Sequence, residues 1–369
     1  MKIGYDVRSF LKEESGVGIY VRKLISSLIE IDNDNKYYLL SSSLKDRFNK
    51  TVFKNNEKIK IKDYRIPVKI LNFLWYKLKF PPMGFFFFKR LDIVHSTVPV
   101  IIPGGRKKII TVHDTCFIDK PLLVMKEAID YFKKDFINSV KRADGIIAVS
   151  EFTKSRILDI AGKEFEDKIR VINQGCDFDE IESKKPDFDV PQKYLFFAGT
   201  IEPRKNLIRL IKAMEMVNKK DKELKLIISG KKGWAYKEIL GYISKTDIQD
   251  NIIITDYISR KELKYLYEKS FAVIIPSLYE GFGFAPLEAA YTNRPVLSSD
   301  IPVFHELYSD YPLYFNPLSY EDIADKILYL LYDENIVNEK IEKGREIKQK
   351  YSWRKTAEKT LSFYKEVLG

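Results

Sequence analysis

The sequence predicts an α/β protein built from two doubly wound parallel sheets that face a cleft. Short β-branched runs alternate with amphipathic helical patterns from end to end, and this alternation favours parallel sheets covered by helices on both faces. The 369 residues exceed one typical core and suit two domains. A polar stretch without apolar period, 180–192, separates the two series of strands. We therefore expect an N-terminal domain at 1–182, a linker at 183–192, a second domain at 193–352 and a C-terminal helix at 353–369.

Six runs in the first half are predicted strands, because each is short, apolar and rich in β-branched residues. Helical periods at 17–30 and 125–143 lie between some of these runs. A strand, a helix and a further strand in succession form the unit from which parallel sheets are built. The predicted strands span 1–7, 36–42, 91–96, 107–114, 144–150 and 168–175.

The second half repeats this organisation. A helix is expected after its first strand, because Leu207, Leu210 and Met214 recur at helical spacing. The last helix is expected to begin at Ser352, a residue type that caps helix starts, and to bury a stripe that includes Trp353. The predicted strands span 193–200, 224–230, 251–257, 271–277 and 294–300.

Composition restricts the class of protein. Apolar residues make up 45% of the chain, and no stretch approaches the roughly 20 apolar residues of a membrane span. The first residues enter a strand without a signal-peptide pattern, so we expect a cytoplasmic protein. Cys116 and Cys176 have no metal-ligand spacing and are expected to be unpaired. The net charge of +11 favours anionic partners such as nucleotides, phospholipid surfaces or nucleic acid.

The stretch SLYEGFGFAPLEAA places two glutamates around a glycine loop. The loop leaves the carboxyl end of a predicted strand, which is where open α/β sheets bind ligands. Gly281 and Gly283 allow tight turns, and the following helix start attracts an anion such as a phosphate. Glu288 is then placed to accept hydrogen bonds from a vicinal diol such as a ribose, and Glu280 from a second hydroxylated group. The simpler interpretation is that both glutamates only favour the helix N-terminus electrostatically.

Arg204 and Lys205 stand at the same predicted sheet edge, directly before a helix that Asn206 is expected to cap. An Arg fork and a mobile Lys charge together suit a pyrophosphate leaving group. A solvated surface pair is the alternative for these two residues taken alone. In the first half, Gly16 and Gly18 open a helix, and His113 ends a strand; a simple turn and a structural histidine are the alternatives there.

The sequence resembles the retaining glycosyltransferases of family 4, group 1, and among them the mannosyltransferase-like enzymes of polysaccharide assembly. The resemblance implies two Rossmann-like domains, the GT-B fold. Its most specific parts are the two glutamates with seven intervening residues and the string EPRKN. It runs through nearly the whole chain in the segments GVGIYVRKL, TVHDTCFIDKP, ADGIIAVSEFTKSRI, KIRVINQGCD, FFAGTIEPRKNL, PSLYEGFGFAPLEA, RPVLSSDIPVFHEL and SWRKTAEK.

The resemblance also implies roles for individual residues. By position, Arg204 and Lys205 would hold the donor diphosphate, while Glu288 would bind the ribose hydroxyls and Glu280 the sugar hydroxyls. The remaining implied contacts are those of the amides of Phe282, Gly283 and Phe284 with sugar and phosphate, of Gly16 and Gly18 with the donor, and of His113 with the transferred sugar.

The implied reaction transfers a hexose, with mannose favoured, from a nucleotide diphosphate sugar to a glycan or lipid-linked acceptor in polysaccharide biosynthesis, with retention at the anomeric carbon. Glucosyl, rhamnosyl or N-acetylglucosaminyl transfer to a soluble acceptor is the alternative. No cofactor is expected besides the donor substrate. Two Asp-x-Asp strings, 177–179 and 187–189, suggest metal-dependent glycosyltransferases, but Arg204 and Lys205 supply the positive charge that a metal otherwise would, so no metal is expected.

Nucleic acid and an anionic membrane are two further candidate partners. A nucleic-acid-binding protein would explain the net charge, but the chain lacks a matching motif and the two loops would stay unexplained, so no nucleic acid is expected. The segment 70–91 mixes Lys and Arg with Trp and many Phe. It is either a basic aromatic patch that contacts an anionic bilayer at the inner face of the membrane, or a core helix with its loop.

Overall fold

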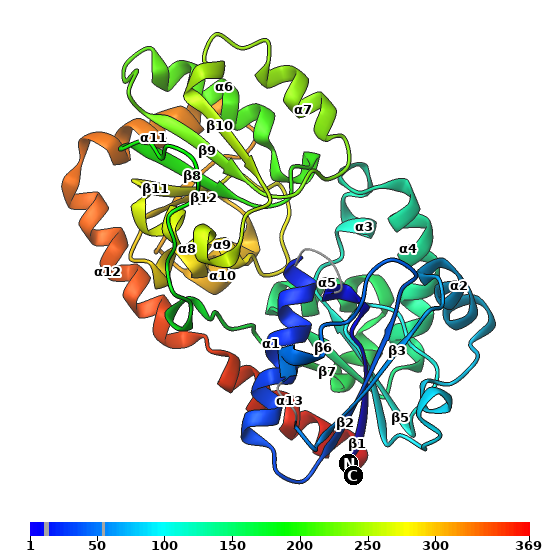
Figure 1. Ribbon diagram of the computed structural model, residues 1–369. Coiled ribbons are helices and arrows are strands. Elements are labelled where there is room, and N and C mark those ends of the chain that lie inside the picture. Colours follow the sequence, from blue (N-terminus) through cyan, green and yellow to red (C-terminus); the bar gives the residue numbers. More distant parts are fainter. Residues whose placement is uncertain (11–14, 54–55) are drawn as a thin grey trace. The chain divides into compact units, whose positions relative to one another are not determined.

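The computed structural model describes residues 1–10, 15–53 and 56–369. The chain divides into two compact units, each with its own parallel sheet (Figure 1). The first unit contains Met1–Ile118, Lys126–Gly175 and Ser352–Gly369, and the second contains Asp119–Met125 and Cys176–Tyr351.

The division after Gly175 differs from the expected linker at 183–192. Phe178 is fully buried, and Lys264 Nζ donates hydrogen bonds to the carbonyls of Phe178 and Ile181, both at 2.7 Å. The polar residues before the second sheet are therefore attached to the second unit, because their backbone and one aromatic side chain already pack there.

The first unit holds a seven-stranded sheet in the order β3-β2-β1-β4-β5-β6-β7. All neighbouring strands pair in parallel. The six expected strands form, and the edge strand β3 is additional. The bounds are β1 (Lys2–Asp6), β2 (Lys36–Ser42), β3 (Ile59–Tyr64), β4 (Ile93–Ser96), β5 (Lys107–Val112), β6 (Gly145–Ala148) and β7 (Ile169–Val171).

The helices of the first unit follow its strands. The expected helix at 17–30 forms as α1, and the one at 125–143 as α4. Their bounds are α1 (Gly16–Ile31), α2 (Val68–Asn72), α3 (Cys116–Asp119), α4 (Lys126–Arg142), α5 (Glu151–Ala161) and α13 (Trp353–Leu368).

The terminal helix α13 packs within the first unit, far along the chain from its partners. Ser352 caps it as expected, accepting a hydrogen bond from the Lys355 amide. Trp353 lies beside Tyr20 of α1, with ring centroids 6.1 Å apart. A Cβ on Gly175 would stand 2.1 Å from the backbone nitrogen of Trp353, so only glycine permits this approach of the two backbones.

The second unit holds a six-stranded parallel sheet in the order β10-β9-β8-β11-β12-β13. The five expected strands form, and the three-residue edge strand β13 is additional. Its strands are β8 (Tyr194–Ala198), β9 (Lys225–Ser229), β10 (Ile252–Asp256), β11 (Ala272–Ile275), β12 (Val296–Ser299) and β13 (Leu313–Phe315), and its helices are α6 (Leu207–Asn218), α7 (Tyr236–Ile243), α8 (Arg260–Lys269), α9 (Phe284–Tyr291), α10 (Pro302–Tyr308), α11 (Tyr320–Tyr332) and α12 (Glu334–Lys350).

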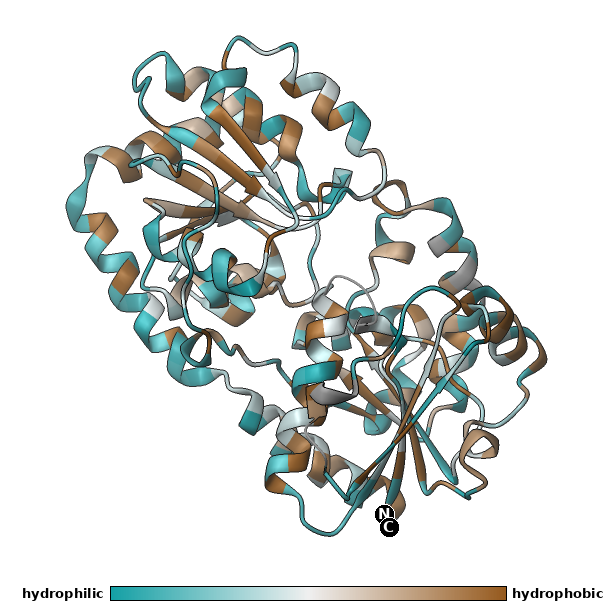
Figure 2. Cartoon of the chain, viewed as in Figure 1, coloured by the Kyte–Doolittle hydropathy of each residue, from teal (hydrophilic) through white to brown (hydrophobic). Residues whose placement is uncertain are grey.

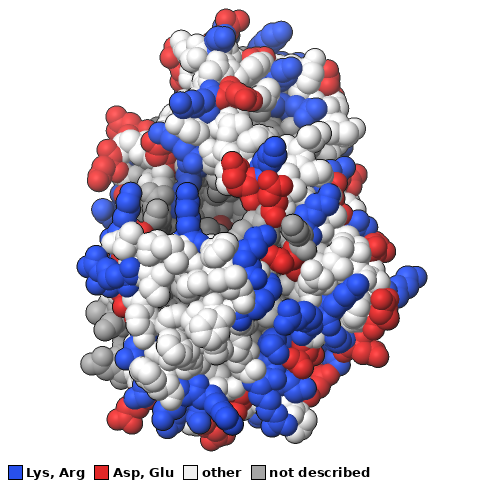
Figure 3. Space-filling view, turned by 90° about the vertical axis from the view of Figure 1, so that its right-hand side faces the viewer, with Lys and Arg blue, Asp and Glu red and all other residues white. Residues whose placement is uncertain are grey.

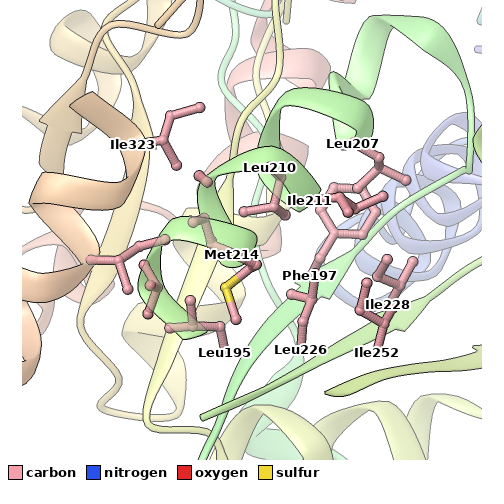
Figure 4. Close-up of a cluster of buried hydrophobic side chains, with 14 of the residues drawn as sticks. Leu195, Phe197, Leu207, Leu210, Ile211, Met214, Leu226, Ile228, Ile252 and Ile323 are labelled. Carbon is pink, nitrogen blue, oxygen red and sulfur yellow. The ribbon is translucent and has the colours of Figure 1, made fainter. Parts of the chain in front are cut away.

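Alternate residues of β8 face opposite layers of helices. Leu195 and Phe197 join the cluster that includes α6 and α11 (Figure 4). Phe196 faces the other way, and its ring meets that of Tyr267 on α8 at 4.9 Å. Because both faces of a central parallel strand are buried, these strands are apolar throughout, which Figure 2 shows as predominantly brown arrows. The fold class of two parallel α/β sheets is thus confirmed.

Candidate active site

Arg204, Lys205 and Glu280 meet at the carboxyl edge of the second sheet. A 3₁₀ turn, Pro203–Lys205, carries the two cations after β8, and Glu280 follows β11. Strands β8 and β11 are parallel neighbours, so the segments that leave their carboxyl ends lie side by side. The amide of Leu278 donates to the Arg204 carbonyl at 2.9 Å and ties the two loops together.

Glu280 binds both cations at once. Its Oε2 accepts from Arg204 Nη1 at 3.0 Å, and its Oε1 accepts from Lys205 Nζ at 2.5 Å. Arg204 is held further by Glu202, whose Oε1 accepts from Nε at 3.0 Å, and by the Tyr279 carbonyl. The cations are thus ordered before any anionic ligand arrives, which lowers the entropic cost of binding one.

These cations determine the charge of Glu280. The residue is buried, and burial alone would raise the pKa of its carboxyl. The charges of Lys205 and Arg204 outweigh burial and lower this pKa to about 2. Glu280 is therefore an anion at neutral pH and an acceptor of hydrogen bonds.

The expected role of Asn206 as a capping side chain is wrong. Asn206 has a left-handed backbone with φ of 57° and makes no side-chain cap bond to α6. Its Nδ2 donates instead to the Pro317 carbonyl at 2.7 Å, and its Oδ1 accepts from Arg209. Asn tolerates this conformation better than most residues, so Asn206 redirects the chain between the 3₁₀ turn and α6.

The glycine loop before α9 is closely packed. Gly283 has φ of 76°, and a Cβ there would stand 2.7 Å from the Phe304 ring, so a side chain is excluded at this position. Phe282 is 3% exposed, and Tyr308 donates its hydroxyl hydrogen to the Gly283 carbonyl. Helix α9 begins at Phe284. The loop backbone is therefore fixed by aromatic packing.

Glu288 lies in a buried charge cluster that sequence analysis missed. Its Oε1 accepts from Arg260 Nη1 at 3.2 Å and its Oε2 from the Tyr267 hydroxyl at 2.8 Å. Arg260 Nη2 also donates to Asp177 Oδ1 at 2.5 Å. Burial raises the pKa of Glu288, and Arg260 and Tyr267 oppose that rise. The position of Arg260 just beyond β10, at the same sheet edge, was the one available signal.

The Asp-x-Asp string 177–179 makes ion pairs with separate cations. Asp177 binds Arg260, whereas Asp179 binds Lys348 of α12 at 2.9 Å. Within the described residues, no group of three or more His, Cys, Asp or Glu side chains is arranged to hold a metal ion.

The remaining predicted residues belong to the first unit. His113 directly follows β5 and donates from Nε2 to the Thr97 carbonyl at 3.2 Å, while the Tyr20 ring meets its imidazole edge-on. Burial lowers the pKa of His113 to about 4, so the ring is neutral at pH 7. Gly16 opens α1 as expected, and the Gly18 amide donates to the side chain of Ser15, the N-cap.

The structure thus assembles the predicted residues in two groups. Arg204, Lys205 and Glu280 are in direct contact, and Phe282, Gly283, Phe284 and Glu288 continue from Glu280 along the same loop and helix of the second unit. His113, Gly16 and Gly18 form the group of the first unit.

Comparison with known proteins identifies the family. Residues 15–180 match Glycosyltransferase Family 4, and residues 178–347 match Glycosyl transferases group 1. The chain is 33% identical over 229 residues to an O-antigen chain mannosyltransferase of Salmonella typhimurium, a match that covers 62% of this chain and 61% of that protein, less than two thirds of its length. It is 27% identical over 269 residues to O-antigen chain mannosyltransferase B of Escherichia coli, with 70% of each chain covered.

Solved structures support the fold over the whole chain. Sucrose-phosphate synthase of Thermosynechococcus elongatus superposes with a TM-score of 0.78 at 16% identity, over 99% of this chain and 98% of that one. HepE of Anabaena, solved with UDP and glucose, superposes with a TM-score of 0.74 at 14% identity, over 99% of this chain and all of its own. The two family matches run from residue 15 to residue 347, so this chain belongs to the family 4, group 1 glycosyltransferases.

Proposed function

We propose that this chain transfers mannose from a nucleotide diphosphate sugar to a glycan or lipid-linked acceptor in polysaccharide biosynthesis, with retention at the anomeric carbon. The observation that carries the proposal is the contact of Arg204 and Lys205 with Glu280 at the carboxyl edge of the second sheet. Two relatives of this protein are O-antigen chain mannosyltransferases, which supports mannose among the hexoses.

The chemistry assigned to this site is stabilisation of the leaving group. Cleavage of the sugar–phosphate bond leaves negative charge on the nucleoside diphosphate, and Arg204 and Lys205 would neutralise that charge without a metal or other cofactor. Glu280, an anion between them, would accept hydrogen bonds from the sugar hydroxyls, and Glu288 from the ribose. The amides of Phe282, Gly283 and Phe284 would bind sugar and phosphate.

For His113, Gly16 and Gly18, the roles beside the transferred sugar and the donor rest on the resemblance. A neutral imidazole at His113 that donates from Nε2 to the Thr97 carbonyl keeps Nδ1 as an acceptor, which is suited to a hydrogen bond from a sugar hydroxyl.

A donor panel tests the proposed reaction. The purified protein would be incubated with GDP-, UDP- and dTDP-sugars, and nucleotide release would be followed with and without a glycan acceptor. We expect a mannose donor to give the fastest release. The Lys205→Ala protein is the matched control for release by contaminants. A preference for another sugar would contradict the assignment of mannose.

N-acetylglucosaminyl transfer is the second candidate. A poly(ribitol-phosphate) α-N-acetylglucosaminyltransferase of Staphylococcus aureus is 30% identical over 238 residues, covering 63% of this chain and 47% of its own. The same donor panel separates the two candidates, because the sugar of the preferred donor identifies the transferred group.

Independence from metal is part of the proposal. Because the diphosphate charge is assigned to Arg204, Lys205 and backbone amides, we expect turnover to survive an excess of EDTA. Complete loss of turnover that manganese or magnesium restores would contradict this mechanism.

We also propose that the segment 70–91 contacts an anionic bilayer. It carries four Lys or Arg residues and no Asp or Glu. Its inward side chains, among them Trp75 and Phe86, are buried in a core cluster, which accounts for the interpretation as a core segment. Its outward apolar side chains are exposed: Ile70, Phe73, Leu78, Phe80, Phe85 and Phe88, the last by 83%.

Charge complementarity supports an anionic membrane as the partner of this surface. Figure 3 views the side of the molecule on which α2 lies, and in its lower half Lys and Arg side chains surround an uncharged surface. Exposed aromatic groups ringed by cations favour the interface of an anionic membrane. None of the described helices combines the length and hydropathy that crossing a bilayer requires.

Vesicle flotation tests the membrane contact. Wild type should float with phosphatidylcholine vesicles that contain phosphatidylglycerol, and less with phosphatidylcholine alone or at high salt. The Phe85→Ser/Phe88→Ser protein should lose most of this binding, while Lys359→Glu, an exposed change on α13, should retain it. Equal flotation of all three proteins would refute the contact.

A further inference from the structure

Arg260 is a largely buried cation that the proposed reaction leaves unexplained. It is the first residue of α8, and its side chain is 15% exposed. Its guanidinium bridges two carboxylates, those of Glu288 and Asp177, through different nitrogens. It also lies over the Phe178 ring at 4.8 Å. A planar guanidinium that is bound by two carboxylates and covered on one face by an aromatic ring has little freedom to move.

The contacts of Glu288 leave acceptor capacity on both oxygens. A carboxylate has about four lone-pair positions, and Arg260 and Tyr267 use one on each oxygen. One position therefore remains on Oε1 and one on Oε2. Two neighbouring ribose hydroxyls can each donate to one of these positions, while Arg260 and Tyr267 hold the carboxylate.

We propose that Arg260 is a positioning residue, which keeps Glu288 ionised and oriented as the acceptor for the ribose hydroxyls of the donor nucleotide. This inference rests on the proposed function, in which Glu288 binds the ribose. The guanidinium contacts Glu288, Asp177 and the Phe178 ring, so it acts through Glu288.

Electrostatics agree with this geometry. Glu288 is 6% exposed, and burial raises the pKa of its carboxyl; Asp177 raises it further, while Arg260 and the Tyr267 hydroxyl lower it. Cys176 and Tyr308 also interact electrostatically with Glu288, and burial keeps the thiol and the hydroxyl neutral by raising their pKa values. Without Arg260, burial would favour the protonated acid, which is a poorer acceptor.

Affinity for GDP and UDP, measured by titration calorimetry between pH 6 and pH 9, tests the inference. Arg260→Met should bind the nucleotide about tenfold more weakly at pH 6.5, the size of one charge-assisted hydrogen bond. The loss should shrink as pH rises, because Glu288 regains its charge. Arg260→Lys, which keeps a cation, should recover part of the affinity. Lys261 is the next residue of α8, and Lys261→Met removes its exposed ion pair with Glu182. This variant should bind the nucleotide like wild type at every pH.

A double-mutant comparison separates positioning from a structural role. Arg260→Met removes the cation that pairs with the buried Asp177, so the same change is also made with Asp177→Asn, which removes that carboxylate charge and protects folding. In a Glu288→Gln background, the further change Arg260→Met should cost about twofold or less, since no carboxylate charge remains to be maintained. A loss that is independent of pH and persists in the Glu288→Gln background would overturn the inference.

The failure of the proposed function gives a different result. If Glu288→Gln alone binds GDP and UDP as tightly as wild type, the assignment of Glu288 to the ribose is wrong, and the inference falls with it. If Glu288→Gln weakens binding but Arg260→Met does not, only the role of Arg260 is wrong.

Discussion

At the scale of single residues, Glu280 joins the sugar and phosphate parts of the proposed site. One carboxylate oxygen binds Arg204 and the other binds Lys205. A diphosphate that approaches the two cations competes with Glu280 for them, while a sugar hydroxyl needs Glu280 as an acceptor. In the proposed reaction, the three side chains would act on both sides of the bond to be broken, and their separate contributions can be measured.

Substitutions at the two cations should reduce turnover. We expect Arg204→Ala or Lys205→Ala to lower it by roughly 10², the scale of losing one preorganised charge-stabilising group. Turnover with the preferred donor provides the measurement, and circular dichroism checks folding. Near-normal turnover in both proteins would show that the diphosphate lies elsewhere.

Glu280→Gln should separate binding from transfer. The free nucleoside diphosphate should bind no more weakly than to wild type, because both cations remain and lose a competing anion, yet transfer should fall. Calorimetric titration beside turnover distinguishes the two effects. Weaker binding of the free diphosphate would mean that Glu280 serves chiefly to order Arg204 and Lys205.

At the scale of elements, a buried hydrogen-bond chain joins α13 to the first sheet. The Tyr364 hydroxyl bonds His95 Nδ1 at 2.6 Å, and His95 Nε2 bonds the Thr111 hydroxyl at 2.7 Å. Tyr5 on β1 bonds Tyr364, and Tyr20 on α1 bonds Thr111. Two helices and three strands thus share one polar network, which a neutral His95 completes by donating from one nitrogen and accepting at the other.

This network predicts acid sensitivity of the first unit. Burial lowers the pKa of His95 to about 3, whereas an unfolded histidine has a pKa near 6.5. The unfolded chain therefore binds more protons in this window. The contribution of the neutral His95 to the free energy of unfolding is complete above pH 6.5. It is lost as pH falls toward 3, by about 1.4 kcal/mol per pH unit.

Urea unfolding between pH 6.5 and pH 5 provides the measurement. In His95→Gln, the free energy of unfolding of the first unit should be lower at neutral pH and flatter with pH. His305→Gln, which changes an exposed histidine of the second unit, is the control and should keep the wild-type slope. The same slope in His95→Gln would contradict the assignment.

At the scale of the whole molecule, the last helix, α13, packs in the first unit together with residues 1–118. Phe363 of α13 is 3% exposed and packs against the Gly145 backbone of β6, where a Cβ would stand 2.7 Å from its ring. We expect Phe363→Ala to destabilise the first unit by about 3 to 5 kcal/mol. The exposed change Lys359→Ala should alter it by less than about 0.5 kcal/mol.

Hydrogen exchange resolved by segment can follow each unit separately. Protection in Phe363→Ala should fall in β1, β4, β5 and β6 and remain in β8 and β11, because α13 belongs to the first unit by its contacts. A uniform loss of protection over both sheets would show instead that the two units unfold together.

The sequence alone was sufficient for the fold class and for the buried strands. Central parallel strands are covered on both faces, so their residues are continuously apolar. Such a run can be recognised in the sequence whatever the order of the strands in the sheet. The edge strands β3 and β13 were not expected, because β3 alternates Ile with Lys and β13 has three residues. Edge strands are half-exposed, and their apolar signal is weak for that reason.

For the site, local motifs predicted Arg204, Lys205, Glu280 and Glu288. The first three follow recognisable strands whose ends topology brings to one edge, and Glu288 lies in the helix that follows the Glu280 loop. The environment of Glu288 depended on tertiary structure alone. Arg260 lies 28 residues from Glu288 and 83 from Asp177 along the chain, and no periodicity encodes such a pairing. Periodic patterns record which face of an element is buried, whereas the partner of a buried charge is decided only when separate elements pack together.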